Sequence, residues 1–409
     1  MAQQQYLVGL DIGSAAVRVV VGKIEEDSQQ PSIIGVSETP SAGIRKGVIV
    51  DIDEAVSTIS SALEKVERMT GVQITHAVVA IGGSHISSIE SHGVIAVSRA
   101  DGEITENDII RVIDASQAIS IPQNREIIHV IPKNFTVDGQ SGIKDPLGMT
   151  GIRLEVDTVI VQAAAPFLKN LQKAIAQAGL QIDDTVLAPL AAAQSALNKR
   201  QKELGVALID MGGGTTGLVV FEEGELLHTA IVPVGSAHIT NDVAIGLRTS
   251  IETAEKVKLE FGHAIPREVP RGEEIDLSKI DPAEEEKASR HQLAEIAEAR
   301  LEEIFDLINA ELKKIGRDAK LPAGVVLTGA GAKMSGVLEL AKKHLKLPVQ
   351  MGLPANVKTV IDRVEDPAFA TAVGLVLWAN EYGRGGKSAE MFDGKFFKSI
   401  GKWFKKFLP

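Results

Sequence analysis

The sequence lacks the residues and patterns on which several classes of function depend. It has no cysteine, which excludes disulfides, thiol nucleophiles and cysteine-ligated metal sites. Uninterrupted apolar stretches, such as residues 375–379, are far shorter than the roughly 18 residues of a membrane-spanning helix. Residues 1–8 show no basic region followed by an apolar run, so we expect no secretory signal. The nine histidines are scattered, without the spacing of metal ligands.

Acidic residues outnumber basic ones, and the charge is unevenly spread along the chain. The net charge of −11 argues against a nucleic-acid partner, which usually meets a basic surface. Residues 395–409 nevertheless hold five lysines, no acidic residue and five of the 15 aromatic residues. A glycine-rich stretch that begins at residue 383 separates this tail from the preceding chain, and we predict a flexible linker over 383–394.

The tail has the pattern of an amphipathic helix. At about 100° per residue, its apolar side chains fall within an arc of roughly 140°, and its lysines lie on the other side. This pattern is typical of a helix in the membrane interface that binds anionic lipid, although docking onto the body or a partner remains an alternative. The predicted membrane-facing residues are Phe396, Phe397, Ile400, Trp403, Phe404, Phe407 and Leu408, flanked by Lys398, Lys402, Lys405 and Lys406.

Short β-branched runs alternate with helical patterns in the rest of the chain, which predicts α/β architecture. We predict strands at 6–11, 17–24, 77–81, 156–163, 206–210, 217–221 and 324–327. We predict helices at 52–69, 106–118, 166–178, 190–199, 250–261, 282–315, 337–344 and 367–381. Asp51 or Asp53 can cap the first helix, and Thr249 with Glu252 predicts a capping box for the fifth. Residues 262–280 are interpreted as a loop.

One segment occurs twice in modified form. LVGLDIGSAAVRVV (7–20) and ALIDMGGGTTGLVV (207–220) each read as a strand ending in Asp, a turn of small residues and a second strand. The two aspartates, Asp11 and Asp210, are about 200 positions apart, which indicates two related lobes that face each other.

Each of these turns makes chemical sense as half of a phosphate clamp. Small residues let backbone N–H groups approach phosphate oxygens, and the hydroxyls of Ser14, Thr215 and Thr216 add donors. An aspartate so close to phosphate must act through a cation or its water shell, which predicts Mg²⁺. Either turn alone is more typical of a glycine-rich hairpin without a ligand, and neither is a Walker or Rossmann loop. A third turn, VVLTGAGAKMSGV (325–337), could accept adenine or ribose.

These three motifs, in this order, resemble those of the actin, sugar kinase and heat-shock chaperone superfamily. Within it, almost the whole chain resembles the FtsA family of bacterial cell-division proteins, including SSIESHGVIAV and VIPKNFTVDG in the segment 82–158 and the amphipathic terminus. The resemblance implies an α/β, actin-like two-lobed ATPase fold of duplicated ribonuclease-H-like domains, with an inserted small α+β subdomain and a C-terminal amphipathic helix.

The resemblance also implies a domain plan. The first-lobe core would span 1–82, 163–199 and 367–382, with the inserted subdomain at 83–162. The second-lobe core would span 200–245 and 321–366, with an outer subdomain at 246–320, followed by the linker 383–394 and the tail 395–409.

Matched residue by residue, the family's ATP site falls on three turns and one helix. The implied nucleotide-binding residues are Asp11, Gly13, Ser14, Ala15 and Arg18; Asp210, Gly212, Gly213, Gly214, Thr215 and Thr216; Gly235; Glu255 and Lys258; and Gly329, Ala330 and Gly331. Asp11 and Asp210 would hold Mg²⁺ through water. Glu255 and Lys258 could instead belong to a solvated helix face. Ala188 stands where superfamily members carry a residue that positions water, so we expect slow or negligible hydrolysis.

The family resemblance further implies a role and partners. The protein would form filaments with ATP, bind the inner face of the cytoplasmic membrane at the division site, and tether FtsZ filaments and other division proteins. The Glu- and Lys-rich helix predicted at 282–315 is interpreted as a lobe exterior or as part of a partner surface. A sugar-kinase-type enzyme, a chaperone and an actin-like pilus-assembly protein are the alternatives.

Overall fold

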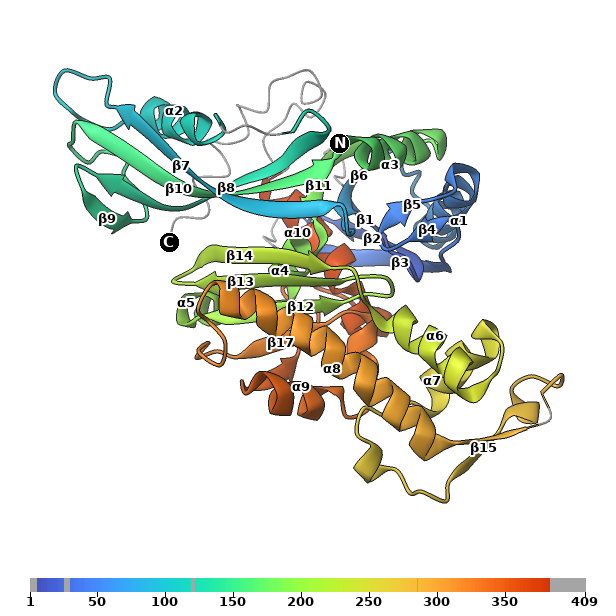
Figure 1. Ribbon diagram of the computed structural model, residues 1–409. Helices are drawn as coiled ribbons and strands as arrows, with labels where there is room; N and C mark the ends of the chain where they lie inside the picture. The colour runs from blue at the N-terminus through green and yellow to red at the C-terminus, as the bar shows by residue number, and fades with distance from the viewer. Residues whose placement is uncertain (1–5, 26–29, 119–121, 285, 383–409) are drawn as a thin grey trace.

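The computed structural model describes residues 6–25, 30–118, 122–284 and 286–382. The predicted linker and amphipathic helix, 383–409, lie outside these residues. The described chain forms two lobes and a projecting subdomain (Figure 1).

The first lobe is built on a five-stranded mixed sheet. Its strands, in spatial order, are β11 (Gln181–Leu187), β6 (His76–Ile81), β1 (Tyr6–Ile12), β2 (Ala16–Lys23) and β3 (Ser32–Pro40). Four helices cover it: α1 (Ile52–Thr70), α3 (Ala165–Gln177), α4 (Ala188–Ala196) and α10 (Ala370–Tyr382). Alternate residues of β1 enter different cores, Leu7 packing with α4 and α10 and Val8 with α1 and α3, so both faces of the sheet are buried.

The second lobe repeats this arrangement. Its strands are β14 (Glu225–Val232), β13 (Thr216–Glu222), β12 (Val206–Met211), β17 (Val325–Thr328) and β18 (Val349–Met351). The central strand in each lobe pairs antiparallel with the next strand in sequence and parallel with a later one. The repeated sequence segment is therefore a repeated structural unit, as predicted.

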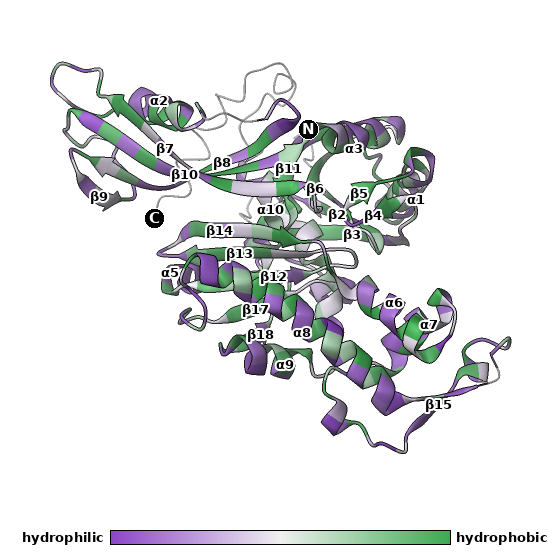
Figure 2. Ribbon diagram, viewed as in Figure 1, coloured by the Kyte–Doolittle hydropathy of each residue, from purple (hydrophilic) through white to green (hydrophobic). Residues whose placement is uncertain are grey.

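The helices of the second lobe form its outer layer. They are α5 (Lys199–Leu204), α6 (Ser236–Leu247), α7 (Ile251–Phe261), α8 (Arg290–Lys314) and α9 (Val337–Leu345). Figure 2 shows hydrophobic and hydrophilic residues alternating along α8, whose apolar side chains enter the core while its acidic residues face outward.

The inserted subdomain is an antiparallel sheet with one helix. Its strands are β7 (Ile86–Ala96), β10 (Arg153–Ala164), β8 (Arg125–Val137) and β9 (Gln140–Ile143), and α2 (Glu106–Ser116) covers one face. Although it departs from the first lobe, it also reaches the second, because the Ser88 hydroxyl donates to the Thr229 carbonyl at 2.6 Å.

Several local predictions can be compared with the observed elements. The predicted strands all form. The predictions did not include the strands β3, β7, β8, β9, β11, β14 and β18 or the helices α5 and α6. Asp51 caps α1 as predicted, accepting the Glu54 N–H at 3.0 Å. The capping box at Thr249 is wrong, because Ser250 caps α7. The helix predicted from 282 begins only at Arg290.

The last two errors have physical reasons. Thr249 directs its hydroxyl to Glu284, which leaves Ser250 to accept the Thr253 N–H at 3.1 Å. Residues ahead of α8 pair instead as the hairpin β15 (Glu274–Asp276) and β16 (Lys287–Ser289), so part of the predicted loop is ordered structure. The smaller elements are β4 (Ile44–Arg45), β5 (Val48–Ile49), η1 (Pro266–Glu268), η2 (Leu277–Lys279), η3 (Ala330–Lys333), η4 (Asp362–Glu365) and η5 (Pro367–Phe369).

Candidate nucleotide site between the lobes

The two repeated turns have the same backbone geometry. In the first, the Gly13 N–H donates to the Ala16 carbonyl at 3.1 Å, and in the second the Gly212 N–H donates to the Thr215 carbonyl at 3.0 Å. Each turn follows the aspartate of its strand by two residues. Asp11 and Asp210 therefore occupy equivalent positions in the two lobes.

The turns face each other at close range. A Cβ added to Gly213 would lie 2.8 Å from the Ala15 Cβ, and one added to Gly214 would lie 2.7 Å from the Ser14 Oγ. Both distances are shorter than ordinary carbon or oxygen contacts, so only glycine fits at these two positions. The floor of the cleft between the lobes is thus formed by backbone, as a phosphate-binding site requires.

Most of the residues predicted to bind nucleotide line this cleft. They are Asp11, Gly13, Ser14, Ala15, Arg18, Asp210, Gly212, Gly213, Gly214, Thr215, Gly329 and Ala330. The third turn lies directly beside the second, because a Cβ on Gly329, whose φ is +85°, would be 2.5 Å from Asp210 Oδ1. The parallel pairing of β12 with β17 brings these turns together.

Three predicted residues lie behind the cleft wall and do not line it. The Thr216 hydroxyl donates to the Val234 carbonyl at 2.8 Å. Gly235 lies against the second turn, where the first N–H groups of α6 donate to the carbonyls of Gly212 and Gly213. Gly331 packs against Met211. These residues support the turns from behind.

Glu255 and Lys258 form a separate network on α7. The Lys258 ammonium, only 7% exposed, donates to Glu255 at 2.6 Å and to the Thr240 hydroxyl at 2.8 Å. The Thr240 hydroxyl in turn bonds to Glu255. The pair therefore fixes α7 to α6, and neither residue is among those that line the cleft.

Two lining residues carry polar contacts that sequence reasoning missed. The Gly47 N–H donates to Ser14 Oγ at 2.8 Å, and the Thr371 hydroxyl donates to Asp210 Oδ2 at 3.2 Å. Gly47 lies in the turn between β4 and β5, and Thr371 lies in an almost entirely apolar helix, so neither had a local signal. Ala188 and Pro189, singled out from the sequence, also line the cleft.

Arg18 fits an anionic ligand. The residue is 8% exposed, and its guanidinium donates to Glu38 at 2.7 Å and lies over the Phe369 ring, 5.7 Å from its centroid. Its buried Nε has no hydrogen-bond partner among the described residues. A buried cationic group with an unused donor at a cleft lined by backbone is a suitable partner for a phosphate.

Burial makes the ionised forms of the two aspartates unfavourable. Burial raises the pKa of Asp11 to about 7, with Arg18 opposing the shift and Asp210 adding to it. Burial also raises the pKa of Asp210, against the Thr371 hydrogen bond and Arg18. A divalent cation near both carboxylates would relieve this cost. Within the described residues no group of three or more His, Asp or Glu could hold a metal by itself, so the phosphates would have to complete such a site.

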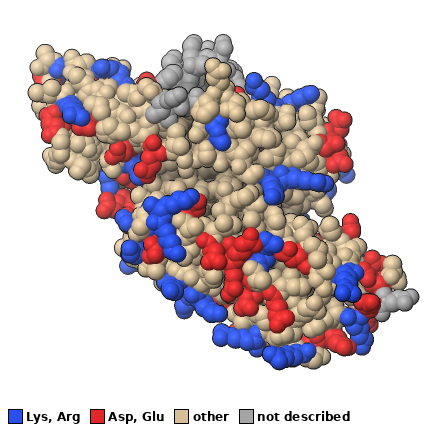
Figure 3. Space-filling view, viewed as in Figure 1, with Lys and Arg blue, Asp and Glu red and all other residues tan. Residues whose placement is uncertain are grey.

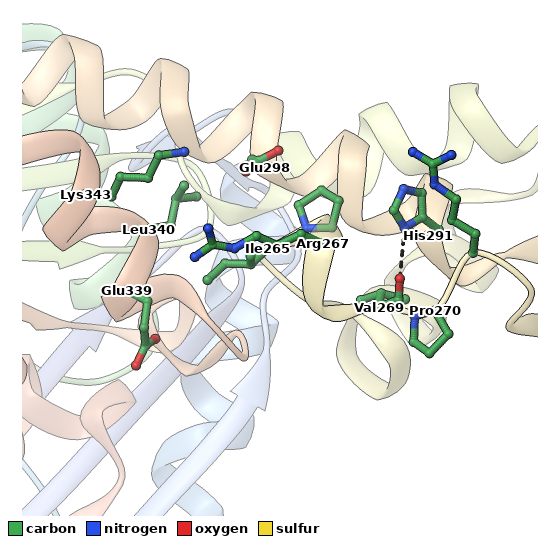
Figure 4. Close-up of a pocket in the computed structure, with 11 residues that line it drawn as sticks. Ile265, Arg267, Val269, Pro270, His291, Glu298, Glu339, Leu340 and Lys343 are labelled. Carbon is green, nitrogen blue, oxygen red and sulfur yellow. Dashed lines mark hydrogen bonds between the residues drawn. The ribbon is translucent and has the colours of Figure 1, made fainter.

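A larger cavity, of about 770 Å³, lies on the second lobe away from these turns. It is lined by η1 and by residues of α8 and α9, among them His291, whose Nδ1 bonds to the Val269 carbonyl at 3.0 Å (Figure 4). No paired aspartates or facing glycine turns line it. We therefore assign the candidate nucleotide site to the narrower cleft.

The lobes, the facing turns and the inserted subdomain define the class of protein. Among solved structures the chain is similar to the PilM–PilN type IV pilus biogenesis complex, with a TM-score of 0.67, 16% identity and coverage of 92% of this chain and 98% of that chain. It is also similar to MreB5 of Spiroplasma citri bound to ADP, with a TM-score of 0.52, 14% identity and coverage of 98% and 99%. The chain has the actin-like ATPase fold.

Sequence comparison gives the family within this class. Residues 207–374 match the family model "Cell division protein FtsA", and residues 83–162 match "SHS2 domain inserted in FTSA". The chain is 40% identical to cell division protein FtsA of Pseudomonas aeruginosa over 372 residues, covering 91% of this chain and 88% of that protein. It is 42% identical to the Bacillus subtilis FtsA over 379 residues, covering 93% and 84%. The chain belongs to the FtsA family, and its role is in cell division.

The raised pKa of Asp11 predicts a stability cost that a substitution can remove. Between pH 4 and about 7 the folded protein holds a proton that the unfolded chain releases, so the free energy of unfolding falls as pH rises through this window. Asp11→Asn should therefore stabilise the nucleotide-free protein by about 2–4 kcal/mol at pH 8 and much less at pH 4.5. Urea unfolding at the two pH values measures this, with the exposed Asp362→Asn as control. If Asp11→Asn changed the free energy of unfolding equally at both pH values, the raised pKa of Asp11 would be contradicted.

Proposed function

We propose that this protein binds ATP with Mg²⁺ between its lobes, assembles into filaments and attaches to the inner face of the cytoplasmic membrane through residues 395–409. In this state it tethers FtsZ filaments and further division proteins at the division site. The proposal that the protein binds ATP is supported by the two equivalent turns, which face each other with a buried aspartate behind each.

Different residues of the cleft would bind the phosphates, the magnesium ion and the adenosine of Mg-ATP. Backbone N–H groups of the two turns, the hydroxyls of Ser14 and Thr215, and the Arg18 guanidinium would bind the phosphates. Asp11 and Asp210 would hold Mg²⁺ through its water shell, and Gly329 and Ala330 would pack against the adenosine. Because the two turns touch in the structure, a nucleotide would separate them, so nucleotide binding and the angle between the lobes should change together.

We expect hydrolysis by the purified protein to be slow. The Ala188 methyl lines the cleft at the start of α4, and the cleft-lining carboxylates are Asp11 and Asp210, both assigned to Mg²⁺. An alanine offers no hydrogen bond that could orient an attacking water. Steady-state phosphate release should therefore stay below about one per minute, although ATP binds, which is far under the typical enzyme turnover of roughly 10 per second. Turnover at an ordinary enzymatic rate would contradict this proposal.

Filament assembly is supported by apolar side chains at opposite ends of the molecule. Leu147 and Ile152 are 44% and 78% exposed on the inserted subdomain, and Ile245 and Leu259 are 78% and 74% exposed on α6 and α7. Figure 1 shows α6 and α7 at the far end of the molecule from β9. Exposed apolar groups at two ends suit head-to-tail contacts between copies.

Membrane attachment is proposed from the tail's sequence. No helix among the described residues is long and apolar enough to cross a bilayer. Each tail lysine would contribute on the order of 1 kcal/mol at an anionic surface, and each buried aromatic about 1.5–3 kcal/mol. The entropy of ordering the helix offsets much of this sum, so a single tail would bind reversibly and a filament of many tails firmly.

Co-sedimentation with phosphatidylglycerol vesicles tests the anchor. The full chain with Mg-ATP should pellet with the vesicles, whereas a chain ending at Gly386 should stay in the supernatant. A Trp403→Ala, Phe407→Ala variant keeps every lysine and should lose most binding, which separates insertion from charge attraction. Binding by the shortened chain would show that the tail is not the anchor.

We further propose that the second-lobe cavity is the surface that meets FtsZ. Arg267, Arg271 and Lys343 line it, against the two lining glutamates Glu298 and Glu339. Figure 3 shows acidic side chains gathered over the outer face of this lobe and basic ones along its lower edge, where Figure 1 places α9. A net positive cavity on a chain of charge −11 favours an acidic segment of the partner.

Charge reversal within α9 tests this surface. Lys343→Glu should weaken FtsZ binding at least about tenfold, because it reverses a cavity cation, and raised salt should reduce the difference. Lys342→Glu makes the same charge change on the neighbouring exposed residue, which does not line the cavity, and should have little effect. Equal losses in the two variants would indicate non-specific attraction and contradict the assignment.

A further inference from the structure

Four charged side chains of alternating sign form one row across the first-lobe sheet. Asp11 on β1 is the register partner of Arg18 on β2, and Arg18 is the register partner of Glu38 on β3. Residues directly opposite each other on neighbouring strands share one face of the sheet. Arg363 of η4 continues the row beyond the edge strand, because its guanidinium donates to Glu38. The inner end of the row is at the nucleotide cleft, which Asp11 and Arg18 line.

Glu38 divides its carboxylate between the two arginines. Its Oε1 accepts from Arg18 at 2.7 Å, and its Oε2 accepts from Arg363 at 2.8 Å. Both guanidinium groups also lie over the ring of Phe369, at 5.7 and 6.0 Å from its centroid. The Arg18 guanidinium is therefore held on one side by an aromatic face and at one end by a charge-assisted hydrogen bond.

Arg18 has a second carboxylate beside it, on the strand nearer the cleft. Directly opposite residues of antiparallel strands have Cβ atoms about 5 Å apart, so Asp11 is a natural ion-pair partner for Arg18. The two are close enough for the charge of Arg18 to oppose the rise in the pKa of Asp11. The guanidinium nevertheless donates to Glu38, and its buried Nε has no hydrogen-bond partner among the described residues.

We infer that Glu38 is a positioning residue of the nucleotide site, which holds Arg18 away from Asp11 so that each stays available to a ligand of opposite charge. The inference rests on the proposed binding of Mg-ATP. A direct pair of Arg18 with Asp11 would neutralise the cation that a phosphate needs and the carboxylate that Mg²⁺ needs. Glu38 prevents this pairing by offering Arg18 a carboxylate that does not itself line the cleft.

Arg363 supports this arrangement from the outer side of Glu38. A carboxylate next to Arg18 cancels part of the positive charge that attracts a phosphate. With Arg363 the group consists of two guanidiniums and one carboxylate, so its net charge is positive. The Arg363 side chain is 58% exposed, and water and salt therefore screen its charge.

Two neutral variants separate the position of Glu38 from its charge. Glu38→Gln and Glu38→Met both remove the charge and have side chains of similar length, but only glutamine keeps an oxygen that accepts from Arg18. The experiment measures the dissociation constant of Mg-ATP for the full chain, below the concentration at which it sediments as polymer. We expect Glu38→Met to bind at least about fivefold more weakly than Glu38→Gln, because only the methionine variant leaves the guanidinium without its acceptor.

Urea unfolding without nucleotide shows whether each variant folds. If Glu38→Met does not fold, Glu38→Asp gives the same test, because it keeps the charge but moves the carboxylate back by one carbon. It should bind Mg-ATP more weakly than the native protein.

A double-mutant cycle shows whether Glu38 acts through Arg18. In an Arg18→Met background, Glu38→Gln and Glu38→Met should bind Mg-ATP within about twofold of each other, since no guanidinium remains to be positioned. Arg363→Met changes the charge of the row but keeps the bond of Glu38 to Arg18, and should weaken binding by at most about twofold. The control is Glu64→Met, at an exposed glutamate of α1 that pairs with Arg68 and does not line the cleft, and it should have no effect.

Each contrary result overturns a definite statement. If Glu38→Met binds as well as Glu38→Gln, the positioning role is wrong and the proposed binding of ATP stands. If their difference persists without Arg18, Glu38 does not act through that residue. If Arg363→Met weakens binding as much as Glu38→Met, the summed charge of the row decides the affinity, and an equal loss in Glu64→Met would make the effect non-specific. If the native protein fails to bind Mg-ATP, the nucleotide part of the proposed function fails, and this inference with it.

Discussion

The structure depends on two carboxylates that face the same cleft from opposite lobes, both removed from water. Asp11 and Asp210 stand at equivalent places in two copies of one strand–turn–strand unit, and burial raises the pKa of each. Such a pair is costly in the absence of a cation, and the surrounding groups reduce the cost only partly, Arg18 by its charge and Thr371 by its hydrogen bond. Arg18 and Thr371 are thus the groups that hold these carboxylates in the cleft.

Backbone contact explains why the cleft consists of such small residues. At Gly213 and Gly214 a side chain would collide with Ala15 or Ser14 of the other lobe, and at Gly329 it would collide with Asp210. The glycines thus allow the two lobes to meet through their main chains, whose N–H groups are the donors that phosphates need. The same closeness makes the angle between the lobes sensitive to anything placed between the turns.

The site residues that could be predicted from the sequence are those whose pattern lies in neighbouring residues. The Asp–x–Gly pattern at Asp11 and Asp210 is local, so both hairpins could be predicted from it, and most of the residues named with them line the cleft. Thr371 and Gly47 carry no local signal, since their roles come from bonds to Asp210 and Ser14, far away in the chain. Gly235 and Thr216 belong to the motifs, yet they support the turns from behind.

The sequence alone determined the α/β class, the duplication, the two turns of small residues and the distinct basic, aromatic terminus, because periodicity, repeated motifs and composition are properties of neighbouring residues. Only the tertiary structure decided that Lys258 is buried against Thr240, that the inserted subdomain contacts β14, and that α10 joins the cleft to the end of the described chain. These features arise from burial and from hydrogen bonds between distant segments. Their energies depend on which surfaces the fold brings together, and no local pattern records that.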